Sequence, residues 1–371
     1  YDLWRLSQVL DWIEPYDIGG ARAIFGSFME GKPILSTIGE SKENAARRRL
    51  WHLLLEGDRG CILWWSEDCI DWKAPGCPLT AKGRALAAVT REMTGPLAGL
   101  IVRARREWDP VAIHYSQPGV QVNWLIESTE DGRTWHRRFS SYESTHNRQA
   151  AQRVAWLRQL RRAGYTPRFL SSEQIGRGDL ARGGWKALVM QGSLAMSDRE
   201  AAAVRAFAAA GGTLVYEGEP AAFDERGRLR AAPVFVARAA CSNVAAAVAA
   251  VPPPVRVSPA SAGVAVHRYR LGDARLIAIE RDVDVRMGED LKLVGGDAAS
   301  ETPVAVEVTL DRAGHVTDLR DGRRLGRTDR VQLTVDPWRP SILAVTDAPL
   351  PDGDPVAHLA AAAARQGARK Q

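Results

Sequence analysis

Apolar positions in the first hundred residues switch repeatedly between strand-like runs and helical spacing. The runs predict strands at 9–14, 33–37 and 61–66, and the helical spacing predicts helices at 20–29 and 44–56. A longer helix rich in Leu, Ala and Val is predicted over 80–104. Because strand and helix alternate, residues 1–105 are predicted to form part of a parallel sheet or barrel.

Strand and helix also alternate over residues 109–240. Short apolar runs predict strands at 111–115, 165–170, 186–190 and 213–217. A helix is predicted over 146–163, and Ser197 followed by Glu200 is the capping-box pattern of a helix start. Four strands joined by crossover helices predict a small doubly wound sheet.

The pattern changes again after an Ala-rich predicted helix at 239–250 and three consecutive prolines. Short alternating runs predict strands at 264–270, 276–280, 304–310, 331–335 and 341–345. Residues 255–348 are therefore predicted to form an antiparallel β-sandwich, and residues 349–371 a flexible tail or frayed helix. The chain is predicted to be an α/β multidomain protein, since 371 residues suffice for two or three domains.

Composition and charge narrow the class of function only a little. The chain is 45% hydrophobic and 25% charged, which is ordinary for a globular protein. Its net charge of +6 comes from arginine, because only 7 of the 50 basic residues are lysine. These arginines form no stripe interleaved with aromatic residues, so a nucleic-acid partner is not predicted.

Four cysteines are too few for a disulfide scaffold in a chain of this length. The spacing of Cys61, Cys69 and Cys77 matches no zinc motif, so neither a metal nor another cofactor is predicted. No apolar run approaches the roughly 18 residues of a membrane helix, so no membrane partner is predicted. The chain starts at Tyr1 without an initiator Met or signal peptide, which predicts truncation and leaves the compartment open.

Residues 49–68 carry the strongest hint of chemistry. A predicted helix, a Gly turn and a strand deliver four candidate site residues to one strand end: Trp64, Trp65, Glu67 and Asp68. Barrel enzymes keep their chemistry at the carboxyl ends of strands, and indole rings beside carboxylates suit glycan binding. The alternative is that both tryptophans belong to the core.

Several phrases resemble the family 42 glycoside hydrolases, bacterial β-galactosidases that carry a trimerisation domain. They are DWIEPYD (11–17), GKPILSTIGE (31–40), RLWHLLLEGDRGCILWWSED (49–68), KALVMQGSLAMSDREAAAVRAFAAAGGTLVYEGEP (186–220) and DLRDGRRLG (318–326). The resemblance implies the last three βα units of a TIM barrel, a flavodoxin-like trimerisation-type domain and a C-terminal β-domain. It also implies a carbohydrate substrate, a homotrimer and the absence of the first five barrel strands.

The resemblance implies a retaining mechanism as well. Such enzymes need a nucleophile and an acid/base whose carboxyl groups lie roughly 5 to 5.5 Å apart. Glu40 is the candidate nucleophile, although the family's position for it falls two residues earlier, near Ile38. The acid/base has no counterpart here, so the chain alone is predicted to be inactive. Alternatively, Glu40, Ser41 and Glu43 only open the following helix.

The same barrel mouth would include Glu14 and Tyr16 with Trp64, Trp65, Glu67 and Asp68. Carboxylates would accept hydrogen bonds from sugar hydroxyls, and an indole would cover the apolar face of the ring. A buried salt bridge with an arginine is the alternative for Glu14. His52 is predicted to be structural, because no partner stands at metal-ligand spacing.

Glutamine amidotransferases share the flavodoxin-like fold and offer a rival enzyme class. The corresponding turn, residues 190–194, holds Ser193 but no cysteine and no Gly-x-Ser-x-Gly motif, so Ser193 is predicted to be a turn residue. No Gly-rich phosphate loop follows Tyr115, so nucleotide binding is not predicted. The remaining alternative to a hydrolase fragment is a non-enzymatic oligomerisation or carbohydrate-binding module.

Overall fold

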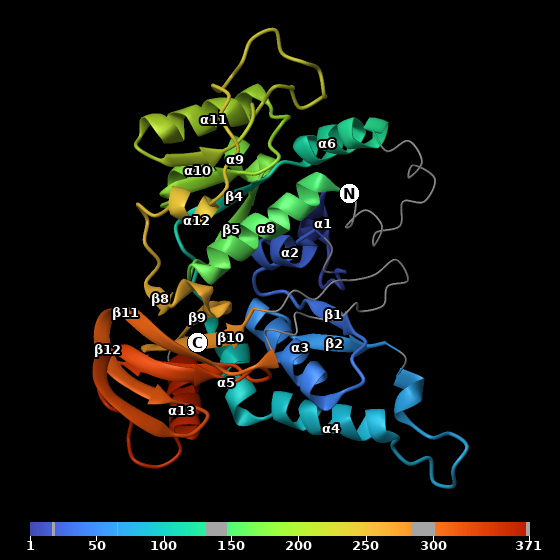
Figure 1. Ribbon diagram of the computed structural model, residues 1–371, viewed down its shortest axis with the longest axis vertical. Coiled ribbons are helices and arrows are strands. Elements are labelled where there is room, and N and C mark those ends of the chain that lie inside the picture. Colours follow the sequence, from blue (N-terminus) through green and yellow to red (C-terminus); the bar gives the residue numbers. More distant parts are fainter. Residues whose placement is uncertain (17–18, 65, 131–146, 283–300, 369–371) are drawn as a thin grey trace.

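The computed structural model describes residues 1–16, 19–64, 66–130, 147–282 and 301–368 (Figure 1). The third region (255–348, orange to red) and most of the first region (1–105, blue to cyan) lie at one end of the molecule, the middle region (109–240, green to yellow) lies at the other, and the first helices of the chain pack between them (Figure 1). The structure is mixed α/β, with parallel sheets in the first two regions and an antiparallel sheet in the third. This confirms the α/β class.

In the first region, three successive chain segments run parallel and side by side. β1 (Leu35–Ile38) pairs with β2 (Gly60–Leu63), and Ile13 forms a parallel bridge with Ile34 on the other side of β1. The helices are α1 (Leu3–Val9), α2 (Ala21–Phe28) and α3 (Glu43–Glu56). Because the three segments are parallel, the residues that follow them meet at one edge.

Two expectations for this region are wrong. The strand expected at 9–14 is reduced to the bridge at Ile13, because α1 extends to Val9 and its first turn is capped by the Asp2 side chain. The helix expected over 80–104 is two helices, α4 (Ala81–Met93) and α5 (Pro96–Arg103). The chain breaks at Gly95 and Pro96, because proline favours a new first turn and disfavours helix in the residue before it.

In the middle region, four parallel strands form a sheet in the order β5-β4-β6-β7. The strands are β4 (Val111–Tyr115), β5 (Arg168–Ser171), β6 (Ala187–Met190) and β7 (Thr213–Tyr216). The helices are α6 (Gln117–Glu130), α8 (Arg148–Arg162), α9 (Ser172–Gly176), α10 (Asp179–Arg182) and α11 (Asp198–Ala209). One face packs on α8 and α2 and the other on α11, which is the doubly wound arrangement that the sequence predicts.

The third region is one antiparallel sheet in the order β12-β11-β13-β10-β9-β3, with β8 also paired to β11. Its strands are β3 (Arg105–Arg106), β8 (Val255–Ser258), β9 (Val264–Leu271), β10 (Ala274–Arg281), β11 (Val304–Asp318), β12 (Arg323–Val335) and β13 (Ser341–Thr346). The pairing runs continuously through all seven strands. β11 pairs with β8 through residues 307–310 and with β13 through residues 315–318. The partner of β11 therefore changes from β8 to β13 along its length.

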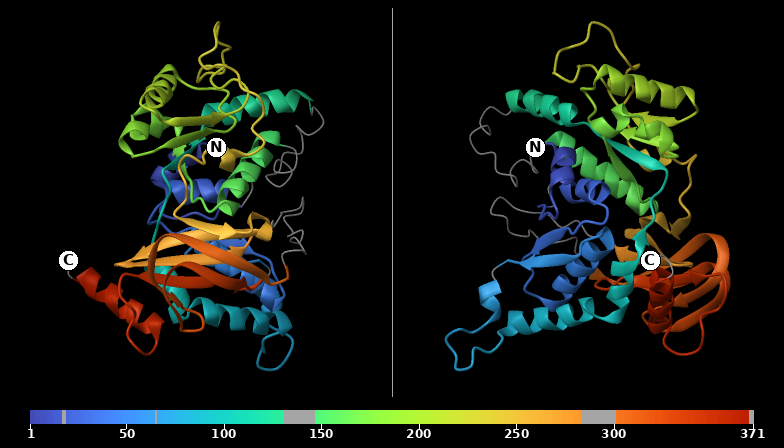
Figure 2. Two further views of the ribbon diagram at one scale, coloured as in Figure 1. Left: turned by 60° about the vertical axis from the view of Figure 1, so that its left-hand side comes forward. Right: turned by 180° about the vertical axis from the view of Figure 1, so that it is seen from behind.

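The segments before β8 and after β13 each contain a helix. The Ala-rich stretch expected to be helical over 239–250 contributes only α12 (Val244–Ala247), which the Asn243 side chain caps. The tail, expected to be a flexible segment or a frayed helix, forms α13 (Pro355–Ala368). Val356 and Leu359 are buried in a core shared with α5, and Figure 2 shows α13 beside the orange and red strands.

A test of helix length and hydropathy finds no single described helix able to cross a membrane. Only α4 and α5 taken together pass it, and they meet at a bend of 57°.

A buried carboxylate at the end of α3 connects all three regions. Glu56 lies 2.5 Å from Arg161 of α8, 3.3 Å from Arg22 of α2 and 3.5 Å from Arg106 of β3. Its other oxygen lies 3.7 Å from His267 of β9. Burial opposes the charged form, but the surrounding cations hold the pKa of Glu56 well below its usual range.

A second buried carboxylate extends this arrangement. Glu280 of β10 lies 2.7 Å from Nε2 of His267 and 2.8 Å from Nδ1 of His52 on α3. Burial opposes its charge, but the two imidazoles lower the pKa of Glu280 to about 2. Glu280 thus ties the third region to the first, and His52 is a structural residue here rather than an isolated one.

Candidate functional site

The carboxyl edge of the three parallel segments brings together several of the predicted site residues. Glu14 directly follows the bridge at Ile13, and its carboxylate accepts a hydrogen bond from the hydroxyl of Thr37 on β1. The backbone N–H of Trp64, just after β2, donates to the carbonyl of Ile38 at 2.8 Å. The Trp64 side chain is 38% exposed. This edge is therefore polar and partly open, and it includes the accessible indole of Trp64.

Strand alternation separates this edge into two faces. Ser36 and Ile38 are buried, and Ile38 packs in the core that α3 and α4 share. Thr37 therefore points to the opposite face, together with the carboxylate of Glu14. Trp64 follows Leu63, which packs against the α3 and α4 core, so alternation directs its indole toward the same opposite face.

Glu40 lies two residues beyond the end of β1. Its carboxylate accepts a hydrogen bond of 3.1 Å from the N–H of Gly39. Burial raises the pKa of Glu40, and the nearby charges of Arg49 and Arg48 on α3 oppose that increase. The net effect is a carboxyl group that stays protonated to a higher pH than a free glutamate does.

The remaining predicted residues lie around this edge in different surroundings. Tyr16 is half-buried, whereas Glu67 and Asp68 are exposed in a short 3₁₀ helix, Ser66–Cys69. The carboxylate of Asp68 lies 3.9 Å from Lys82 of α4. Trp65 lies outside the described residues.

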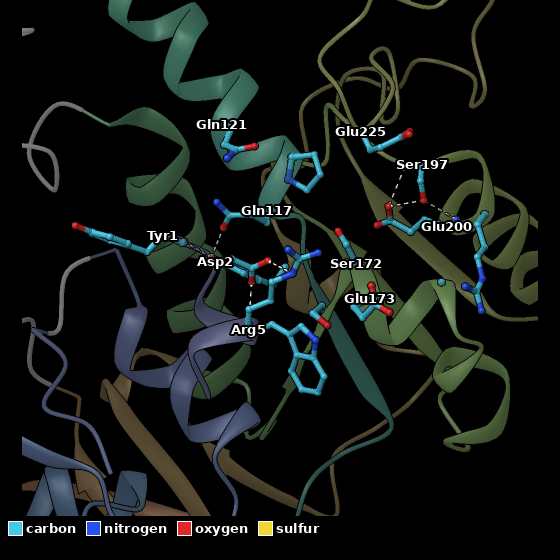
Figure 3. Close-up of a pocket in the computed structure, with 16 residues that line it drawn as sticks. Tyr1, Asp2, Arg5, Gln117, Gln121, Ser172, Glu173, Ser197, Glu200 and Glu225 are labelled. Atoms are coloured by element: carbon cyan, nitrogen blue, oxygen red, sulfur yellow. Dashed lines mark hydrogen bonds and ion pairs between the residues drawn. The ribbon is translucent and has the colours of Figure 1, made fainter. Parts of the chain in front are cut away.

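A separate cavity of about 490 Å³ opens at the carboxyl edge of the middle sheet (Figure 3). α1 forms one wall, and the starts of α6, α9 and α11 form the others. Its polar lining includes Asp2, Arg5, Gln117, Ser172 and Glu200. The cavity was not predicted from the sequence, because α1 and these helix starts are distant along the chain.

The adjoining switch point between β4 and β6, where doubly wound sheets often bind ligands, is closed. The carbonyl of Gly192 accepts hydrogen bonds from the side chains of Asn123 at 2.9 Å and Gln149 at 3.3 Å. Gly119 packs so closely that a Cβ there would lie 2.7 Å from the same carbonyl oxygen. This close packing leaves no room for a phosphate group between the two loops.

Ser193 is part of a buried Ser–His–Glu chain. Its hydroxyl lies 2.9 Å from Nδ1 of His114, and Nε2 of His114 lies 3.3 Å from Glu200. All three residues are at most 3% exposed, and the cavity is lined by Glu200 but not by Ser193. These three linked side chains therefore hold the loop after β6 in place, and Ser193 is not presented to a substrate as a nucleophile.

The described residues contain no group of three or more His, Cys, Asp or Glu that could hold a metal ion. The four cysteines are free thiols.

Comparison with known proteins rests on structure. Neither a protein-family model nor a curated protein matches the sequence. A β-galactosidase from Bacillus circulans sp. alkalophilus matches with a TM-score of 0.62 and 12% identity, over 93% of this chain and 62% of that one. A catalytic mutant of a family 42 β-galactosidase from G. stearothermophilus gives 0.57 and 13%, over 93% and 61%. A family 42 exo-carrageenase from Bacteroides ovatus gives 0.54 and 12%, over 88% and 44%.

These likenesses define a fold class. Over most of its length the chain has a fold like that of the family 42 glycoside hydrolases, which confirms the sequence resemblance at the level of fold. The chain spans about three-fifths of the length of the two β-galactosidases and less than half of the carrageenase.

Proposed function

We propose that this chain is part of a retaining glycoside hydrolase, most like a β-galactosidase, and supplies the last three βα units of its barrel. The observation that carries the proposal is the shared carboxyl edge, where Glu14, Glu40 and Trp64 follow three adjacent parallel segments. Glu40 is the nucleophile, and Glu14 and Trp64 contact the sugar. The third region is a small β-sandwich made by folding of its sheet at β11.

Physical chemistry supports these roles. Thr37 orients the carboxylate of Glu14, which accepts hydrogen bonds from sugar hydroxyls. The exposed indole of Trp64 covers the apolar face of a sugar ring. Arg48 and Arg49 partly offset the effect of burial on the pKa of Glu40 and so favour its ionised form, which attack on the anomeric carbon requires. Tyr16, Glu67 and Asp68 extend the contact surface.

The first test measures binding of a β-galactoside such as lactose by isothermal titration calorimetry. We expect Trp64→Ala to weaken binding about tenfold, because loss of ring stacking costs on the order of 1 kcal/mol. Trp72→Ala, which removes a 64% exposed indole from the following loop, is the matched control and should bind as the unmodified chain does. Equal weakening by both variants would remove Trp64 from the site.

The same chain is tested for turnover of 4-nitrophenyl β-D-galactoside. No hydrolysis above the blank is expected, because the proposed site has no assigned acid/base. Hydrolysis that Glu40→Gln abolishes would instead show a complete site and refute inactivity. Binding without hydrolysis in every condition would favour the carbohydrate-binding module over a hydrolase fragment.

We further propose that the middle region mediates formation of a homotrimer. Leu229 and Val236, in the loops between β7 and α12, are 74% and 81% exposed, and exposed apolar side chains of this kind are suited to burial at an interface. Sedimentation velocity should give a trimer for the unmodified chain and smaller species after Leu229→Lys with Val236→Lys. The control pair Val9→Lys and Val102→Lys, also at exposed positions, should leave the trimer intact. A monomeric unmodified chain would contradict the proposal.

A further inference from the structure

A second cavity, of about 450 Å³, lies between the segment that enters the middle region and the sheet of the third region. Strands β3, β9, β10 and β11 and the turn before β4 contribute its walls. Five arginines line it: Arg105, Arg268, Arg270, Arg275 and Arg312. Neither the sequence motifs nor the proposed hydrolase site accounts for this concentration of positive charge.

Three of the arginines stand directly opposite one another on adjacent strands. Arg105 of β3 pairs with Arg270 of β9, and Arg270 pairs with Arg275 of β10. Arg268 lies two residues before Arg270 and therefore on the same face of β9. Like charges directly opposite each other destabilise a sheet unless negative charge compensates them.

The cavity's own carboxylates compensate only part of this charge. Glu107 lies 2.8 Å from Arg270 and 3.8 Å from Arg275, and Asp311 lies 2.6 Å from Arg275. Asp109 is the third carboxylate in the lining, and it lies 2.6 Å from Arg268. Three carboxylates against five guanidinium groups leave a net charge of +2.

The uncompensated charge lies on the two accessible arginines. Within the ranges that the structure describes, Arg105 makes no ion pair. Arg312 lies 3.8 Å from Asp347, but both side chains are more than half exposed, so this pair is weak. These two guanidinium groups are free to turn toward a ligand.

Two buried donor nitrogens of residues that line the cavity lack hydrogen-bond partners among the described residues. The side chain of Arg268 is 3% exposed, and its Nε has no hydrogen-bond acceptor among the described residues. The indole Nε1 of Trp108, which also lines the cavity, likewise lacks a described acceptor. Buried donors are nearly always paired, so these two nitrogens mark incomplete polar satisfaction in the wall of the cavity.

We propose that this cavity binds a small molecule through an oxyanion group, a carboxylate, sulfate or phosphate. Guanidinium groups bind such oxygens in pairs, and several arginines around one cavity favour a charged ligand over a neutral sugar. The volume exceeds that of a single inorganic ion and accommodates an acidic monosaccharide. The inference does not depend on the proposed hydrolase activity.

The test titrates the full chain with sulfate, phosphate, glucuronate and neutral glucose at constant ionic strength, by isothermal titration calorimetry. We expect saturable binding of at least one oxyanion and none of glucose at this cavity. Arg105→Gln with Arg312→Gln should weaken that binding at least tenfold. Binding of glucuronate alone would identify a sugar acid as the source of the oxyanion, and binding of all three would identify inorganic oxyanions as sufficient.

The control pair Arg327→Gln and Arg330→Gln removes the same charge from exposed positions on β12. It should retain the affinity of the unmodified chain. Equal weakening of binding by both pairs of substitutions would show that binding depends only on the net charge of the protein, and it would overturn the proposal. The absence of saturable binding would also overturn it. Arg105→Lys with Arg312→Lys keeps the charge and should bind with intermediate affinity, so this pair decides the outcome if the glutamine pair fails to fold.

Discussion

Glu56→Gln should lower the free energy of unfolding by about 3–5 kcal/mol, which is the usual cost of removing one partner from a buried ion pair. The side chain of Glu56 is 2% exposed and shares three arginines from α2, β3 and α8. Glutamine has nearly the same shape but no charge. The buried guanidinium group of Arg22 would then lose one of its counter-ions, Glu56, and keep its ion pair with Asp58.

Urea unfolding at neutral pH, followed by circular dichroism, measures this loss. Glu43→Gln is the matched control on the same helix, because Glu43 is 48% exposed and pairs with Arg47 on the surface side. It should cost less than about 1 kcal/mol. Similar losses of unfolding free energy for the two variants would mean that the ion pairs of Glu56 contribute no more to stability than a surface pair does.

The free energy of unfolding should be greatest between about pH 4.5 and 6.5, near the ordinary pKa values of glutamate and histidine. The pKa of Glu280 falls from its usual 4.5 to about 2 on folding. Its contribution, about 3 kcal/mol, is therefore complete above pH 4.5 and is lost as the pH falls toward 2. Burial works against the charged imidazole of His52, but Glu280 raises its pKa, so this contribution is lost as the pH rises through the folded value.

Urea unfolding measured from pH 3 to pH 9 tests this profile. Glu280→Gln should remove the maximum and cost most near pH 5 to 6, where both partners of the pair are charged. Glu307→Gln, on β11 of the same sheet, removes a half-exposed carboxylate and should leave the profile unchanged. A maximum that persists in Glu280→Gln would assign the pH dependence to other groups.

The sequence correctly predicted those helices and strands that are determined by neighbouring residues in the chain. The continuous apolar run of β4 is buried along its whole length, and the capping box of Ser197 and Glu200 opens α11 as expected. The packing of α13 could not be predicted, because its burial depends on α5, more than 250 residues earlier. Periodicity carries no information about such distant partners.

Some features of the candidate site could likewise be predicted from the sequence, and others depend on contacts between distant residues. The sequence predicted that Glu14 and Trp64 would lie at one edge of the sheet, because apolar runs indicate where each parallel strand ends. The pairing of Glu56 with Arg161 joins residues 105 positions apart, and no spacing rule indicates it. The arginine row of the further cavity likewise depends on the register of β3 with β9, which only the fold determines.

The two-residue strand β3 limits how this protein can be dissected. Arg105 and Arg106 leave α5 and complete the edge of β9, and Arg106 also reaches Glu56. A cut at residue 109, where the predicted middle region begins, would remove β3 from the edge of β9 and expose that edge to intermolecular pairing. Separately expressed halves would therefore aggregate more readily than the intact polypeptide, and they should be recovered soluble only when co-expressed.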